Sequence, residues 1–192
     1  MIRVYTSFFI AIPLPEKYLD SFKILIKTIQ LMYPDIPTVN PETPHLTLYY
    51  LIKEAEQDLN KINISVGKCI PLLKDAHLTV GGFNYFGQDQ PKTLYLDAEY
   101  PDDLINFNQQ LNIDLEKYSA HDNDLGFKPH LTVASVKDSV AQKKFQENKD
   151  EIAKLFNEVK WNFPITEIVL YGANSKSSPE IQEQLVHYSL VS

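Results

Sequence analysis

The 192-residue sequence predicts an α+β protein built from two similar halves. Segments with strand character alternate with segments of helical spacing along the chain, which is typical of mixed folds. The tetrapeptide Pro-His-Leu-Thr occurs twice, at 44–47 and at 129–132, so that the copies lie 85 residues apart. The same offset aligns residues 86–87 (Phe-Gly) with residues 171–172 (Tyr-Gly). A constant offset over so much of the chain indicates two halves with one plan.

The first half is predicted to begin with a strand at 6–13 and a helix at about 15–30. The strand is a nearly unbroken apolar run, as expected of a buried strand. The helix has Leu19 and Phe22 at helical spacing, and Pro15 stands at its start, where a missing N–H loses no hydrogen bond. The other elements of this half are a Pro-rich loop at 34–44, a strand at 45–52, a helix at about 54–68, and strands at 76–80 and 82–86.

The second half, at about 91–175, repeats the order of the first half at 5–90. Its elements are a strand at 93–98, a helix at 101–118, a polar loop at 121–126, a strand at 130–136, a helix near 138–157, a strand at 163–171, and a loop rich in Ser and Asn at 173–179. A last strand is expected at 184–191. Because no flexible linker separates the halves near residue 90, we expect one bilobal domain over 1–192.

Composition limits the class of protein. Hydrophobic residues make up 44% of the chain, which is enough for a substantial core. The lone Cys69 excludes an internal disulfide and fits a reducing compartment. No apolar run approaches the ~20 residues that span a bilayer, and the run at 8–12 does not resemble a signal peptide. We therefore expect a cytoplasmic protein with no membrane partner.

The formal net charge of −7 argues against a protein that grips long nucleic acid through many phosphate contacts. An enzyme that acts on one terminal phosphate needs only a few local positive groups. Lysines near the repeated motifs in the sequence are Lys53, Lys92, Lys128, Lys137 and Lys176.

Each motif is predicted to lie on a strand, where alternate side chains share a face. His45 and Thr47 then point one way, and His130 and Thr132 do the same in the second copy. A neutral imidazole can take a proton from water while a protonated one gives a proton to a leaving oxygen, because the pKa of histidine is about 6.5. The threonine hydroxyls can donate to phosphate oxygens. The pattern predicts an acid–base site around one phosphate, with no metal.

Strand parity adds two positions to this face and leaves a third histidine outside the site. Counting in twos places Tyr49 with His45, where it could stack on a base or contact phosphate, and Ala134 with the second motif. A third His-x-Thr begins at His77, but the 85-residue offset aligns this histidine with Asn162. We expect His77 to be an ordinary residue of a sheet.

The two motifs, the second preceded by Phe127 and Lys128, resemble the signature of the 2H phosphoesterases. Within that group the chain is most similar to the RNA 2′,3′-cyclic phosphodiesterases, also called 2′-5′ RNA ligases. The resemblance implies two pseudo-symmetric halves, each with an antiparallel sheet and outer helices, and a central cleft that carries the motifs. It also implies an enzyme without metal or cofactor that opens 2′,3′-cyclic phosphates of RNA ends or nucleotides to 2′-phosphates, with 2′-5′ RNA ligation as a further activity. We expect a monomer.

By this resemblance, His45 is the general acid that protonates the leaving 3′ oxygen, and His130 is the base that activates water. Thr47 and Thr132 would hold the phosphate. Many relatives carry an arginine shortly after the second motif, where this chain has Ala-Ser-Val at 134–136. If that arginine binds phosphate, Lys137 or Lys128 must replace it, or the substrate differs.

Other functions stay open at this point. The substrate could be another cyclic phosphate, such as ADP-ribose 1″,2″-cyclic phosphate or a cyclic nucleotide, or a 2′-5′ oligoadenylate. A nucleotide-binding module without turnover is a different class, although a binder need not keep both proton-transfer groups. A metal hydrolase is disfavoured because the five histidines lack close ligand spacing and there is no cysteine cluster. The least specific alternative is an α+β protein with incidental histidines.

Overall fold

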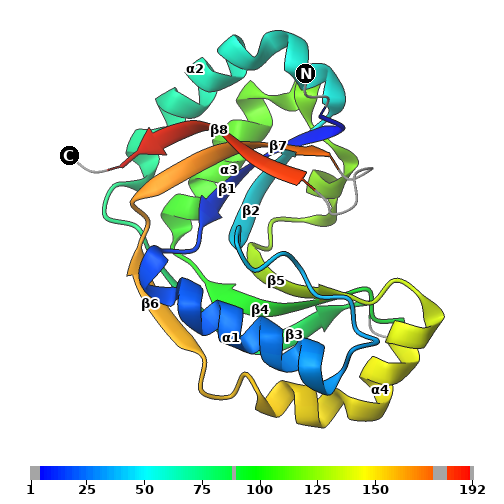
Figure 1. The fold of residues 1–192 in the computed structure, drawn as a ribbon. Coiled ribbons are helices and arrows are strands. Elements are labelled where there is room, and N and C mark those ends of the chain that lie inside the picture. The colour runs from blue at the N-terminus through cyan, green and yellow to red at the C-terminus, as the bar shows by residue number, and fades with distance from the viewer. Residues whose placement is uncertain (1–4, 88–89, 175–180, 191–192) are drawn as a thin grey trace.

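The computed structural model describes residues 5–87, 90–174 and 181–190, which form one α+β unit (Figure 1). Four α-helices and eight strands follow one another along these residues. In chain order they are β1 (Ser7–Pro13), α1 (Glu16–Met32), β2 (His45–Leu51), α2 (Leu59–Cys69), β3 (His77–Phe86), β4 (Thr93–Glu99), α3 (Asp102–Asp114), β5 (His130–Ser135), α4 (Ser139–Lys154), β6 (Lys160–Pro164), β7 (Glu167–Asn174) and β8 (Ile181–Ser189).

The eight strands form a single curled antiparallel sheet in the order β6-β3-β4-β5-β2-β1-β7-β8. It divides into two groups of four strands, which meet where Leu46 of β2 pairs with Leu131 of β5. The α+β class and the antiparallel pairing expected from the sequence are confirmed, and the strands that carry the repeated motifs are neighbours at the centre of the sheet. The sheet therefore brings together two segments that are far apart in the sequence.

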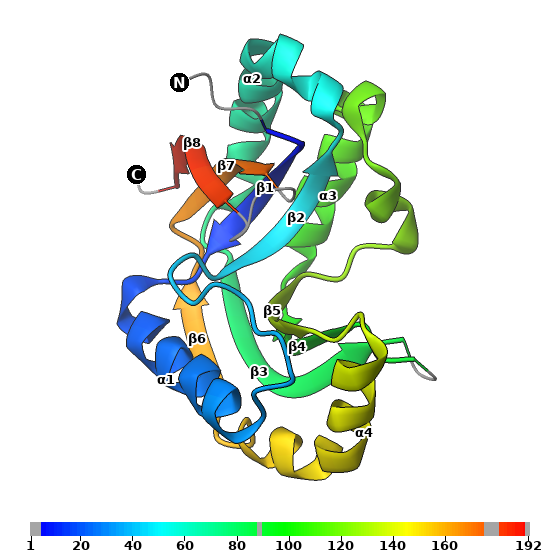
Figure 2. The same cartoon turned by 45° about the vertical axis from the view of Figure 1, so that its right-hand side comes forward.

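The two groups of strands do not coincide with the two halves of the sequence. β7, from the second half, pairs with β1, whereas β3, from the first half, pairs with β4. Helix α1 also crosses over: the Tyr18 ring stacks on Trp161 of β6 at 5.4 Å, and Tyr33 donates to Glu151 of α4. Figures 1 and 2 show α1 and α4 beside β3–β6, and α2 and α3 beside the other group. Each group of strands therefore takes elements from both halves of the sequence.

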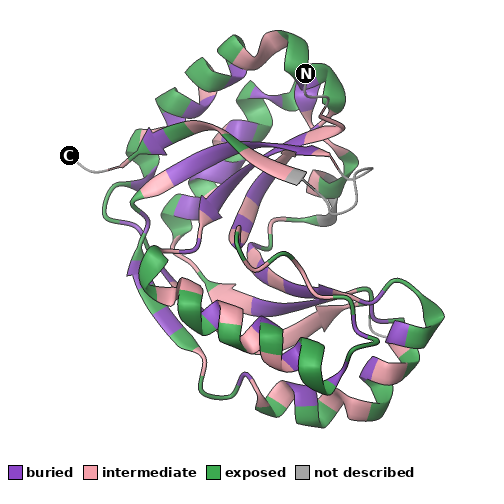
Figure 3. Cartoon of the chain, viewed as in Figure 1, coloured by how far each residue is buried: buried purple, intermediate pink, exposed green. Residues whose placement is uncertain are grey.

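The hydrophobic core lies between the helices and one face of the sheet. Helices α1 and α3 bury equivalent apolar positions, Phe22 on α1 and Phe107 on α3, both with no exposed surface. These two positions are also related by the offset of 85 residues in the sequence. In Figure 3 the buried positions run along the strands, while the outer sides of the helices are exposed. The opposite face of the sheet is left to the motif side chains.

Most of the predicted helices and strands are present, but several begin or end at residues other than those expected. The helix expected at 54–68 begins as a 3₁₀ helix, Lys53–Asp58, before α2. The helix expected at 101–118 ends at Asp114 and is followed by a 3₁₀ turn. The strands expected at 76–80 and 82–86 form the single strand β3, because its pairing with β4 shifts between Val80 and Phe83 and two glycines take up the bulge. Gly82 has φ 74°, which few other residues adopt without strain.

One prediction about the strands is wrong. The segment expected as one strand at 163–171 is divided between β6 and β7, which lie in different groups of the sheet. Pro164 ends β6, and the chain then crosses from one group to the other through Ile165 and Thr166. Strand β8 covers 181–189 instead of 184–191. Of the loop expected at 173–179, the first two residues belong to β7 and the others lie outside the described residues.

Candidate active site

The two motifs occupy one face of adjacent strands. Leu46 and Leu131 pair across β2 and β5 and are both fully buried in the core. In an antiparallel register, the residues on either side of such a pair lie across from each other, so His45 lies across from Thr132 and Thr47 across from His130. All four point to the face opposite the leucines and are partly exposed. The register thus places each histidine across from the threonine of the other motif.

Both histidine rings are anchored in the same way. The Nδ1 atom of His45 lies 2.9 Å from the carbonyl oxygen of Thr43, and Nδ1 of His130 lies 2.8 Å from that of Lys128. A carbonyl oxygen only accepts, so Nδ1 carries the hydrogen in each ring. The Nε2 atom is then the one that gains or loses a proton and is available to a substrate.

A pair of stacked aromatic rings supports each histidine. Phe9 and Tyr171 stack with centroids 4.9 Å apart, and the His45 ring lies 4.8 Å from Phe9. Phe86 and Tyr95 stack at 4.3 Å, and the His130 ring lies 4.9 Å from each. These rings restrict the motion of each imidazole and remove water from one of its sides. Phe86 and Tyr171, which the sequence offset aligns, therefore have the same role: each ring packs against one of the two histidines.

Burial lowers the pKa of both histidines. For His45 this effect is opposed by the hydrogen bond to Thr43 and reinforced by the charge of His130. For His130 the carbonyl of Lys128 opposes the lowering, the Lys128 ammonium adds to it, and Asp97 opposes it. A positive charge on His130 disfavours the protonated form of His45. Protonating one ring makes protonation of the second less favourable, which suits a pair in which one is acid and one is base.

We expect these two rings to make the protein less stable as the pH is lowered. A histidine with a lowered pKa in the folded state binds protons more readily when unfolded, so the free energy of unfolding decreases as pH falls below its ordinary value of 6.5. Urea unfolding between pH 7.5 and 5 should show this decrease in the wild type and a shallower one in His45→Gln/His130→Gln. The exposed His77→Gln should keep the wild-type slope. Equal slopes in all three proteins would contradict the assignment.

The predicted face of Tyr49 is wrong, because a β-bulge follows the first motif. Ala11 of β1 pairs with Thr47, but the preceding Ile10 pairs with Tyr49, so Leu48 is an extra residue. An extra residue reverses the alternation of the strand. Tyr49 is consequently buried in the core and cannot be a surface for substrate, whereas Tyr50 lies on the face of the histidine, with its ring 6.5 Å from that of Phe9.

The second motif has a bulge at the equivalent position. Tyr95 of β4 pairs with Thr132 and Leu94 pairs with Ala134, which leaves Val133 as the extra residue. Ala134 is therefore buried, and Ser135 is the partly exposed residue on the motif face. The sequence indicates both bulges, because two adjacent apolar residues follow each threonine. In a regular strand with one buried face, apolar and polar residues would alternate.

Of the two lysines considered as replacements for an arginine, Lys128 is the one beside a motif. Its Nζ atom lies 2.8 Å from the Tyr95 hydroxyl and 3.3 Å from Oδ1 of Asp97. Lys137 is exposed beyond the end of β5. His77 pairs with Pro164 at the start of β3, three strands away from β2 in the sheet.

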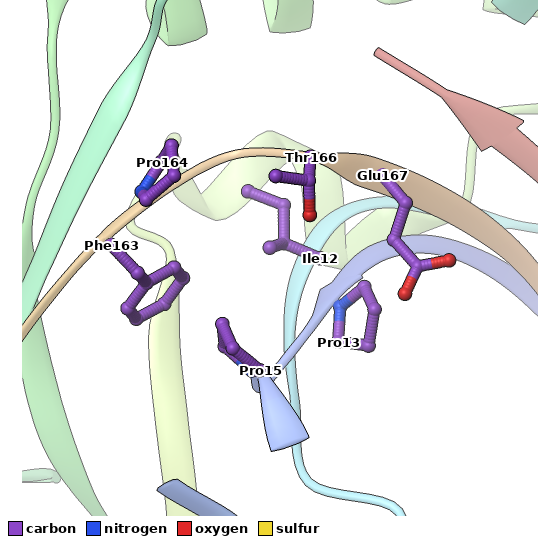
Figure 4. Close-up of a pocket in the computed structure, with 7 residues that line it drawn as sticks. All are labelled: Ile12, Pro13, Pro15, Phe163, Pro164, Thr166 and Glu167. Atoms are coloured by element: carbon purple, nitrogen blue, oxygen red, sulfur yellow. The ribbon is translucent and has the colours of Figure 1, made fainter. Parts of the chain in front are cut away.

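A small pocket lies outside the motif face, between the connection from β1 to α1 and that from β6 to β7 (Figure 4). The proline rings that line it are Pro13, Pro15 and Pro164, and it contains none of the predicted site residues. Within residues 5–87, 90–174 and 181–190, no three His, Cys, Asp or Glu side chains gather as metal ligands would. Over the same described ranges, none of the helices has the length and apolar character required to cross a bilayer.

The eight-stranded α+β fold is that of the 2H class of phosphoesterases. Residues 18–176 match the family described as the 2′-5′ RNA ligase superfamily, and the chain belongs to that superfamily. The resemblance inferred from the sequence is confirmed.

Individual relatives agree with this placement. The RNA 2′,3′-cyclic phosphodiesterase of Thermotoga maritima is 27% identical over 130 residues, which cover 67% of this chain and 69% of the relative. The crystal structure of a Thermus thermophilus protein superposes with a TM-score of 0.72 at 20% identity, covering 96% of this chain and 97% of that one. E. coli LigT complexed with 3′-AMP gives 0.70 at 17% identity, with 98% and 99% covered. The structural matches establish the fold.

Proposed function

We propose that this protein is a metal-independent phosphodiesterase that hydrolyses 2′,3′-cyclic phosphate ends of RNA or of nucleotides to 2′-phosphates. The observation that carries the proposal is the matched pair of imidazoles on adjacent strands, each with Nδ1 bound to a carbonyl and Nε2 left for a substrate. The name of the Thermotoga maritima relative, RNA 2′,3′-cyclic phosphodiesterase, supports the choice of substrate.

In the proposed reaction the cyclic phosphate lies between the two motifs. Nε2 of His130 accepts a proton from a water molecule as the water oxygen bonds to phosphorus. The bond from phosphorus to the 3′ oxygen breaks, and the protonated Nε2 of His45 gives its proton to that oxygen. The hydroxyls of Thr47 and Thr132 donate to the non-bridging oxygens, where negative charge builds up. The product is a 2′-phosphate with a free 3′-hydroxyl.

Ligation uses the same groups. If a 5′-hydroxyl of a second strand replaces water as the nucleophile, the same bond to the 3′ oxygen breaks and a 2′-5′ linkage forms. The description of the family as a 2′-5′ RNA ligase superfamily favours keeping this reaction as a second activity.

The test is hydrolysis of a set of defined substrates by the purified protein with and without EDTA. We expect turnover of nucleoside 2′,3′-cyclic phosphates to 2′-phosphates, unchanged by the chelator, with a bell-shaped dependence on pH. ADP-ribose 1″,2″-cyclic phosphate, 2′-5′ dinucleotides and 3′,5′-cyclic nucleotides should react more slowly. Loss of activity in EDTA would contradict the mechanism. Binding without turnover of any substrate would show a nucleotide-binding module instead.

A further inference from the structure

The two histidines have equivalent anchors but different surroundings. The residue whose carbonyl binds Nδ1 is Thr43 for His45 and Lys128 for His130. The residue paired with the histidine on the next strand is Pro13 on β1 in the first case and Asp97 on β4 in the second. A lysine and an aspartate thus stand where the other half has two uncharged residues.

The lysine and aspartate form an ion pair beside His130. Nζ of Lys128 lies 3.3 Å from Oδ1 of Asp97 and donates to the Tyr95 hydroxyl at 2.8 Å. The ammonium also lies 5.1 Å and 5.6 Å from the ring centroids of Tyr95 and Phe86, the two rings that support His130. The other oxygen of Asp97 accepts from Nδ2 of Asn84 at 2.9 Å. Both ends of the carboxylate are therefore occupied, and its position is fixed by β3 and β4.

We propose that the Lys128–Asp97 pair makes the two histidines chemically unequal, with Asp97 as a positioning residue that holds the Lys128 ammonium beside the His130 ring. This inference rests on the proposed function, since it assigns the pair to the histidine that acts as base. Lys128 contributes at two points: its carbonyl fixes the orientation of His130, and its ammonium supplies a positive charge near the same ring. Holding the ammonium in place also holds the residue that carries this carbonyl.

The charges around His130 determine in which direction the ion pair shifts the pKa of its imidazole. The charged and titratable groups facing its ring are Asp97 and Tyr95 on β4, Lys128 from the preceding connection and His45 on β2, while β3 contributes the uncharged Phe86. A positive charge disfavours protonation of the imidazole, and the effect of Lys128 on His130 exceeds the opposing effect of Asp97. The pair therefore favours a neutral His130, which is the form that can accept a proton from water. His45 has no such pair at the equivalent positions.

The test is a double-mutant cycle on the pKa of His130, measured by NMR titration of its imidazole in the complete protein. Lys128→Met should raise this pKa in the wild-type background and should move the acidic limb of kcat/KM to higher pH. If Asp97 positions the ammonium, the same Lys128→Met change should have less than half that effect in an Asp97→Asn background, because the ammonium is no longer held there. Asp97→Asn alone should lower kcat/KM by roughly tenfold.

Lys143→Met is the matched control, since Lys143 forms an exposed ion pair with Glu147 on α4 at 4.0 Å. It should leave the pKa of His130 and the activity unchanged. Equal effects of Lys128→Met in both backgrounds, or no effect in either, would overturn the proposal. The titration needs no substrate, so an inactive wild-type protein would reject the proposed function while the cycle still decides whether Asp97 positions Lys128.

Discussion

His45→Ala and His130→Ala are each expected to lower kcat on a nucleoside 2′,3′-cyclic phosphate by about 10²–10⁴-fold. In the proposed reaction each imidazole carries a proton that the other cannot carry, because one ring serves the attacking water and the other the leaving oxygen. The two Nε2 atoms are equivalent in their anchoring, so losses of similar size are expected. Initial rates at saturating substrate over pH 5–9 measure the effect.

The double variant should lose little more than either single variant, since the two groups act as a unit. The single variants should each lose one limb of the bell-shaped pH profile, and this identifies which ring is the base. His77 lies on β3, three strands away from β2, so His77→Ala should retain wild-type kcat. A loss in His77→Ala equal to that in His45→Ala would mean that the wrong histidines have been paired.

The sequence predicts the centre of the fold well because the constant offset between its two halves relates equivalent strand positions. A single offset aligns the two motifs, the core residues Phe22 and Phe107, and the aromatic positions 86 and 171, and in the structure all of them occupy equivalent places. These are positions where burial or ring stacking restricts the residue type. Local periodicity is sufficient to locate them.

Connections between the halves could not be predicted in the same way. Strand pairing depends on contacts distant in sequence, and nothing near β7 indicates that it pairs with β1 rather than with strands of its own half. The joined prediction at 163–171 has the same cause, because only Ile165 and Thr166 separate β6 from β7, and nothing local shows that the two strands pair in different groups of the sheet. The faces of Tyr49 and Tyr50 depended on a bulge, and one extra residue reverses every later position on the strand.

The bulge after the first motif is held by a side chain, which leads to a second large expected effect. Leu48 is the extra residue of β2, and its carbonyl accepts a hydrogen bond from Nδ2 of Asn108 on α3 at 2.8 Å. Asn108 is buried, with only 7% of its surface exposed, and its own side-chain oxygen accepts from Asn112 at 3.0 Å. The equivalent carbonyl in β5, that of Val133, is bound instead by the backbone N–H of Val39. In each bulge the carbonyl of the extra residue thus accepts a hydrogen bond from a donor that does not belong to a strand of the sheet.

Asn108→Ala should reduce the free energy of unfolding by about 2–3 kcal/mol, because it leaves the buried Leu48 carbonyl without a donor and opens a small cavity. Where the variant is still folded, kcat/KM should fall by about tenfold or more, since the bulge sets which residues follow Thr47 on the motif face. Urea unfolding and steady-state kinetics at a temperature well below the transition measure the two effects.

Asn112→Ala is the matched control on the same helix, since it removes the bond to the Asn108 oxygen and leaves the bond to Leu48 in place. Asn112→Ala should reduce the free energy of unfolding by less than about 1 kcal/mol and leave kcat/KM unchanged. If Asn108→Ala were destabilised but fully active, the register of β1 and β2 alone would hold the bulge, and Asn108 would act only in the core. Loss of activity in Asn108→Ala and not in Asn112→Ala would instead tie the motif face to one hydrogen bond on the opposite side of the sheet.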